Sequence, residues 1–102
     1  MTAPKIQRDV VRVGMVGTGF AARLRAEALQ GMASAQLVAV AGHTRAETVA
    51  FADQYNAAAL DHWQDLIAHA DLDLIVVCHI NSEHSAVTAA ALEANRHVVV
   101  EY

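Results

Sequence analysis

The stretch VRVGMVGTGFAARLRAEAL, from Val11 to Leu29, decides the fold. A short apolar, β-branched run passes directly into a run of helix-forming residues, and glycines occupy positions 14, 17 and 19 around the junction. Ordered glycine loses more backbone entropy than any other residue, so a cluster of glycines indicates a geometric requirement. A strand that turns tightly into a helix beside a bound phosphate has that requirement.

Positions 17–22 spell Gly-Thr-Gly-Phe-Ala-Ala, a G-x-G-x-x-A motif between the predicted strand and the predicted helix. In this context Gly17 permits the tight turn, Gly19 lets the backbone approach a pyrophosphate, and Ala22 lets the helix pack close to the strand. The first N–H groups of the helix are available to an anion. The motif therefore predicts a dinucleotide site, against the alternative of a tight turn without a ligand. Its expected cofactor-binding residues are Gly17, Thr18, Gly19, Phe20 and Ala21.

Apolar runs and helix-forming runs alternate along the rest of the chain. Strands are expected at 10–16, 35–42, 57–60, 71–80 and 96–102, and helices at 20–32, 45–55, 62–70 and 82–94. Thr44 with Glu47 forms a capping box for the second helix, and Asp61 is the expected N-cap of the third. The pattern predicts an α/β fold, a Rossmann-type doubly wound parallel sheet in three αβα layers with strand order 3-2-1-4-5. We expect a flexible N-terminus over 1–9 and a single dinucleotide-binding Rossmann domain over 10–102.

The composition narrows the class of protein. A chain of 102 residues can build one hydrophobic core, and a net charge of −4 with scattered basic residues argues against nucleic acid as a partner. The sequence contains neither a secretory leader nor an apolar run long enough for a membrane span, so we expect a soluble, cytoplasmic protein without a membrane partner. The single cysteine, Cys78, excludes an internal disulfide, and its apolar neighbours indicate a buried thiol.

The order of these motifs resembles the N-terminal domain of the Gfo/Idh/MocA family, named for glucose-fructose oxidoreductase and inositol dehydrogenase. The resemblance covers Val10 to Tyr102 and depends on the glycine motif, on LVAVAGHTRAETVAFADQY, and on DLDLIVVCHINSEHSAVTAAALEANRHVVVEY. It implies an NAD(P)-dependent oxidoreductase that transfers hydride to or from a small sugar, cyclitol or carbonyl compound. In this family a second, larger α/β domain holds most of the substrate site, and the present chain lacks it. We therefore expect cofactor binding without turnover; a stand-alone, non-catalytic dinucleotide-binding or sensing module is the alternative.

The resemblance also implies cofactor contacts at the end of the fourth strand and just beyond it, at His79, Asn81 and His84, and at the end of the fifth strand, at Glu101. The sequence departs from the family pattern at two places near these residues. The family has Thr-Pro where this chain has His79-Ile80, and it has a lysine, which reaches the nicotinamide and the substrate, where this chain has Tyr102. The Glu-Tyr ending is similar to the biliverdin reductase branch of the family. No catalytic residue is assigned from the sequence.

Cofactor choice in dinucleotide folds depends on the residue that follows the second strand. An acidic residue there accepts hydrogen bonds from the adenosine ribose and repels a 2′-phosphate. By the resemblance this position is Gly42, and His43, Thr44 and Arg45 follow as possible donors to the phosphate. Because Gly42 is neutral and Arg45 can make a charge-assisted contact, we expect NADP(H) to be favoured, with NAD(H) possible. The alternative is that Arg45 is a solvated residue in the first turn of its helix.

The six histidines do not have the spacing of a metal site. His62 and His69 lie seven residues apart on the same predicted helix, and no pair of histidines four residues apart is joined by an acid. We therefore expect these side chains to pack or to cap helices. Trp63 is expected to make a core contact.

Overall fold

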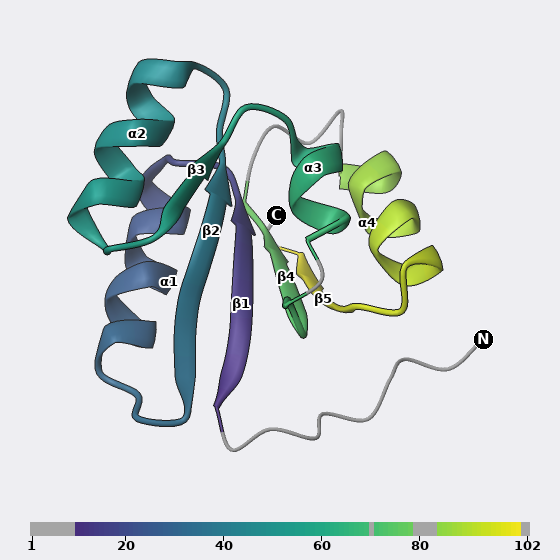
Figure 1. Ribbon diagram of the computed structural model, residues 1–102, viewed down its shortest axis with the longest axis horizontal. Helices are drawn as coiled ribbons and strands as arrows, with labels where there is room; N and C mark the ends of the chain where they lie inside the picture. Colours follow the sequence, from purple (N-terminus) through teal and green to yellow (C-terminus); the bar gives the residue numbers. More distant parts are fainter. Residues whose placement is uncertain (1–9, 70, 79–83, 101–102) are drawn as a thin grey trace.

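The computed structural model describes residues 10–69, 71–78 and 84–100, with only the backbone of His84. The expected flexible segment 1–9 lies outside this part of the chain. Strands and helices alternate as predicted (Figure 1). The described elements are β1 (Val11–Val16), α1 (Phe20–Gln30), β2 (Ala35–Ala41), α2 (Arg45–Gln54), β3 (Ala58–Leu60), α3 (Trp63–Ile67), β4 (Leu74–Val77), α4 (His84–Glu93) and β5 (His97–Val100). None of the helices described is both long enough and apolar enough to cross a membrane.

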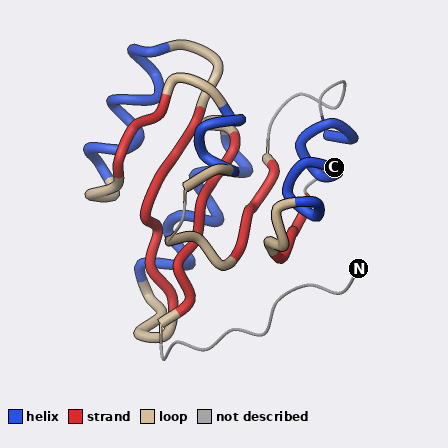
Figure 2. The backbone as a smooth tube through the Cα atoms, turned by 45° about the vertical axis from the view of Figure 1, so that its right-hand side comes forward, coloured by secondary structure: helices blue, strands red, loops and turns tan. Residues whose placement is uncertain are grey.

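The described strands form one parallel sheet in the order β3-β2-β1-β4-β5, which confirms the predicted topology. Figure 2 shows the strands side by side. Because all neighbouring pairs are parallel, the carboxyl ends of the strands lie at the same edge of the sheet. The chain moves from β1 outward to β2 and β3, and then returns across the sheet to β4 on the other side of β1. Ligands of open α/β sheets bind at such a reversal of direction, outside the carboxyl ends of the strands.

Helices cover both faces of the sheet, α1 and α2 on one and α3 and α4 on the other (Figure 1). Successive strand residues face opposite sides, so each face has its own buried cluster. Met15 and Val76 pack on the side of α1 and α2, whereas Val16 and Val77 pack on the side of α3 and α4. Two apolar layers on a twice-covered sheet explain why the strands are continuous apolar runs.

α1 and α2 begin at the predicted residues, but α1 ends at Gln30 rather than at residue 32 and α2 ends at Gln54 rather than at residue 55. Gly31 is the C-cap of α1, and Thr44 is the N-cap of α2, where its hydroxyl accepts a hydrogen bond of 3.3 Å from the Glu47 N–H. The third helix differs from the prediction. It spans Trp63–Ile67 rather than 62–70, and its N-cap is His62 rather than Asp61.

Arg96 binds the backbone at the end of α3. Its guanidinium donates to the carbonyls of Leu72 at 2.9 Å, His69 at 2.8 Å and Ile67 at 3.3 and 3.4 Å. These acceptors belong to the end of α3 and to the segment that leads into β4. The guanidinium thus supplies hydrogen-bond donors to carbonyls at and beyond the end of α3, where a helix leaves its last carbonyls without intrahelical donors.

Candidate functional site

The carboxyl ends of the three central strands are joined by backbone hydrogen bonds. The N–H of Gly17 donates to the carbonyl of Ala41 at 2.8 Å, and the N–H of Cys78 donates to the carbonyl of Val16 at 2.8 Å. Gly17 has a φ of 116°, a backbone conformation that residues other than glycine rarely adopt. The tight turn predicted at this glycine is therefore present, at the reversal point of the sheet.

Space is open beside Gly19, the N-cap of α1. Among the described residues, apart from its two chain neighbours, a Cβ atom built on Gly19 would meet no atom within 4 Å. Glycine has no side chain that could bind the free N–H groups of the first helical turn, and α1 accordingly has no side-chain cap at this residue. Phe20, which follows, is 76% exposed. The loop thus has the form that a pyrophosphate needs, a close backbone approach at a helix N-terminus.

Gly42 joins this loop to the beginning of α2. A Cβ atom at Gly42 would lie 2.5 Å from Oγ1 of Thr48 and 2.7 Å from Cγ2 of Thr18. Thr48 is buried and cannot move aside easily, because its hydroxyl donates to the carbonyl of Thr44 at 2.7 Å. Glycine at this position therefore has a packing reason that the sequence did not reveal. The two predicted groups of cofactor contacts, 17–21 and 42–45, lie next to each other.

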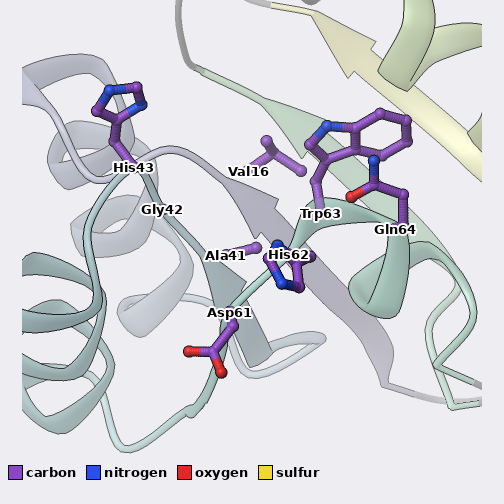
Figure 3. A pocket seen from close by; sticks show the side chains of 8 residues that line it. All are labelled: Val16, Ala41, Gly42, His43, Asp61, His62, Trp63 and Gln64. Carbon is purple, nitrogen blue, oxygen red and sulfur yellow. The ribbon is translucent and has the colours of Figure 1, made fainter.

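A pocket of about 250 Å³ opens at the same edge of the sheet (Figure 3). The ends of β1 and β2 form one part of its wall, and the loop from β3 into α3 forms the other. His43 lies on the first side, and Trp63 and Gln64 lie on the second. The complete lining is Val16, Ala41, Gly42, His43, Asp61, His62, Trp63 and Gln64.

An ion pair links the two sides of this edge. Nη1 of Arg45 lies 2.8 Å from Oδ1 of Asp61, and both side chains are largely exposed. The prediction that Asp61 caps α3 is wrong, because its carboxylate binds the Arg45 guanidinium instead. Arg45 is in the first turn of α2, as predicted, and its side chain has an acidic partner there.

Cys78 follows β4 and is partly buried at the reversal point. Burial raises the pKa of its thiol above the ordinary value of 9.0, and the positive charge of Arg25 opposes this shift. The thiol is therefore protonated at neutral pH, which disfavours a nucleophilic role. The predicted contacts His79, Asn81 and Glu101 lie outside the described residues, and His84 begins α4 without a described side chain.

Within the described residues, no three His, Cys, Asp or Glu side chains are grouped so that they could hold a metal ion. Trp63 packs against the buried cluster under α3 and α4, which confirms the predicted core contact. It also lines the pocket, as do Asp61, His62 and Gln64, which sequence reasoning did not place there. The predicted strand order 3-2-1-4-5 could have indicated this position, because it places the end of β3, and so the residues that follow it, beside the end of β2.

These features can be compared with known proteins. A sequence model of an oxidoreductase family with an NAD-binding Rossmann fold, GFO_IDH_MocA, matches residues 11–102. The chain belongs to this family. Among curated family relatives, it is 33% identical over 95 residues to dTDP-3,4-didehydro-2,6-dideoxy-alpha-D-glucose 3-reductase from Saccharopolyspora spinosa, covering 92% of this chain and 29% of the relative. It is 31% identical over 98 residues to inositol 2-dehydrogenase from Salmonella typhimurium, and the match covers 94% of this chain and 28% of that relative.

Solved structures give the same result. Biliverdin reductase from Synechocystis, in complex with biliverdin and NADP+, superposes with a TM-score of 0.86 at 46% identity and covers 90% of this chain and 29% of that one. A myo-inositol dehydrogenase from Lactobacillus casei, in complex with NAD(H) and myo-inositol, gives a TM-score of 0.84 at 26% identity and covers 89% and 28%. The chain therefore corresponds to less than a third of the length of these relatives, at the dinucleotide-binding Rossmann domain.

Proposed function

We propose that this chain is the cofactor-binding domain of an oxidoreductase that favours NADP(H) over NAD(H). The observation that carries the proposal is the open space at Gly19, which lies beside a helix N-terminus and is joined through Gly42 to Arg45. An anionic dinucleotide fits this arrangement, with its pyrophosphate at the glycine loop and its adenosine end at the beginning of α2. The NADP+ complex of the 46% identical biliverdin reductase supports the choice of cofactor.

The chain's own residues bind and orient the cofactor. A bound nicotinamide dinucleotide supplies or accepts the hydride. The backbone of Gly17 to Ala21 holds the pyrophosphate, and Thr44 and Arg45 hold the adenosine ribose and its 2′-phosphate. Gly42 keeps these two groups in contact because nothing larger fits between Thr18 and Thr48. Asn81, His84 and Glu101 are the proposed contacts at the nicotinamide end.

The substrate class is a small sugar, cyclitol or carbonyl compound. The two curated relatives named above, a nucleotide-sugar 3-reductase and an inositol 2-dehydrogenase, support this class. A second candidate is biliverdin, favoured by the 46% identity to a biliverdin reductase. NADPH oxidation in the presence of biliverdin, compared with NAD(P)+ reduction in the presence of myo-inositol, separates the two in a protein that contains a substrate domain. We propose that the present chain binds cofactor without turnover, because a hydride acceptor must also be positioned.

The proposal is tested with Gly19→Val. Gly19 has a φ of −79° and a ψ of −163°, which valine adopts readily, and its Cβ meets open space, so the variant should fold. The new side chain fills the space beside the helix N-terminus. Isothermal titration calorimetry should show NADP+ binding to the unmodified chain and a loss of at least about tenfold in the variant, with unchanged circular dichroism. Equal affinity in the two proteins would refute the phosphate site.

Arg45→Ala tests the cofactor preference separately. Losing one charge-assisted contact to the 2′-phosphate should weaken NADP+ by about tenfold. NAD+ lacks that phosphate and serves as the matched control ligand, so its affinity should not change. If both cofactors weaken equally, the preference for NADP(H) does not come from Arg45.

A further inference from the structure

We propose that Asp61 is a specificity-determining residue of the cofactor site, whose carboxylate holds Arg45 and competes with the 2′-phosphate of NADP(H) for it. This inference rests on the proposed function, because it places the adenosine end of a dinucleotide at the carboxyl end of β2. It concerns the residue that directly follows β3, a strand that the glycine motif does not include.

Asp61 and Gly42 each follow the end of one of two neighbouring strands, β3 and β2. β2 and β3 are parallel, and their last registered pair is Ala41 with Leu60, so Gly42 and Asp61 leave the sheet next to each other. Both residues line the pocket at this edge (Figure 3). A carboxylate at position 42 would be placed to discriminate against a 2′-phosphate. This chain has glycine there and an acidic residue one strand away.

The carboxylate is already bound to the side chain that the phosphate would use. Nη1 of Arg45 donates to Oδ1 of Asp61 at 2.8 Å, which connects the first turn of α2 to the end of β3 across 16 residues. The two side chains are 63% and 61% exposed, so a ligand can reach both of them. An ion pair this exposed contributes little to folding stability, so exchanging its partner costs the fold little.

The competition follows from charge. A 2′-phosphate carries more than one negative charge and forms strong charge-assisted bonds with arginine. To bind Arg45 it must displace Asp61 or lie beside it, and two anions at that separation repel each other. NAD(H) has a neutral hydroxyl at the same place, which a carboxylate does not repel. Asp61 therefore reduces the ratio of NADP(H) affinity to NAD(H) affinity that Gly42 and Arg45 would otherwise give.

The test is a set of calorimetric dissociation constants for NADP+ and NAD+ with the unmodified chain and with Asp61→Asn. Asparagine keeps the size of the side chain and removes its charge. Affinity for NADP+ should rise about threefold to tenfold, and affinity for NAD+ should stay within about twofold. Asp65→Asn is the matched control, since Asp65 is an exposed carboxylate four residues further along, in the first turn of α3. That control should change neither constant by more than about twofold.

The double variant Arg45→Ala/Asp61→Asn shows whether Asp61 acts through Arg45. Without the guanidinium, the gain in NADP+ affinity from Asp61→Asn should fall to about twofold or less. Equal gains in both backgrounds, the same gain from Asp65→Asn, or weaker NADP+ binding by Asp61→Asn would each overturn the inference. If the unmodified chain binds both cofactors and their ratio does not move, the inference fails and the proposed function stands. If the chain binds neither cofactor, both fail.

Discussion

The two edges of the sheet use charged side chains in different ways. At the amino edge, Arg96 donates to carbonyls of three residues, and Asp73 accepts from the N–H of Arg12 at 3.0 Å. At the carboxyl edge, Arg45 and Asp61 bind each other through exposed side chains. Charged side chains at the amino edge form hydrogen bonds with backbone N–H and carbonyl groups at the ends of helices and strands. Charges at the second edge can exchange their partner for a ligand, so we expect stability to depend on the first and binding on the second.

The largest effect is expected from Arg96→Ala at the amino edge. Removing the guanidinium leaves the carbonyls of Ile67, His69 and Leu72 without these donors, at a cost of about 2 to 4 kcal/mol in the free energy of unfolding. For a domain of this size the midpoint of thermal unfolding should fall by about 10 to 20 °C. Arg23→Ala, at an exposed position of α1, is the control and should stay within about 0.5 kcal/mol. A stable Arg96→Ala protein would show that the two edges do not differ in this way.

Gly42→Ala tests a position that we expect to contribute to both stability and cofactor binding. A Cβ at Gly42 would overlap Thr48 and Thr18, so urea unfolding should show a loss of about 1 to 3 kcal/mol. Both cofactors should weaken together, because the displaced groups belong to both halves of the site. Gly31→Ala provides the comparison: its Cβ would lie 3.6 Å from the nearest atom, the carbonyl oxygen of Ala28, and its φ of −80° suits alanine. That variant should be neutral or slightly stabilised, and equal behaviour of the two variants would remove the packing role of Gly42.

A smaller effect is expected at Cys78, which lies at the carboxyl edge but is partly buried. Burial raises the pKa of the thiol, so the folded chain at pH 8 should react with iodoacetamide several-fold more slowly than the chain unfolded in urea. The same shift contributes stability that is complete below the unfolded pKa of about 9.0 and is lost as the pH rises through the folded value. Equal labelling rates in the two states would contradict the burial of the thiol.

Local signals in the sequence were sufficient for the fold and for the tight turn after β1. The turn at Gly17, the alternation of elements and the Thr44 cap depend on short segments, and the structure confirms these three features. Asp61 was assigned wrongly because an acidic residue before a helix has the pattern of an N-cap, whereas its actual partner is 16 residues away. Gly42 was interpreted as a missing acid, although its contacts with Thr18 and Thr48 give it a packing role. The roles of Asp61 and Gly42 depend on residues that are distant in sequence and close in the fold, and a short segment of sequence does not show such contacts.

The most direct measurement of the central claim is an NMR titration of the isotopically labelled chain with NADP+. If the dinucleotide binds at the carboxyl edge, the amide signals of Gly17, Gly19, Gly42 and Arg45 should shift most. The amides of Asp73 and His97, at the amino edge, should stay in place because their backbone hydrogen bonds of 2.8 and 3.0 Å hold the sheet together there. Largest shifts at the amino edge, or none at the glycine loop with saturating NADP+, would contradict the account.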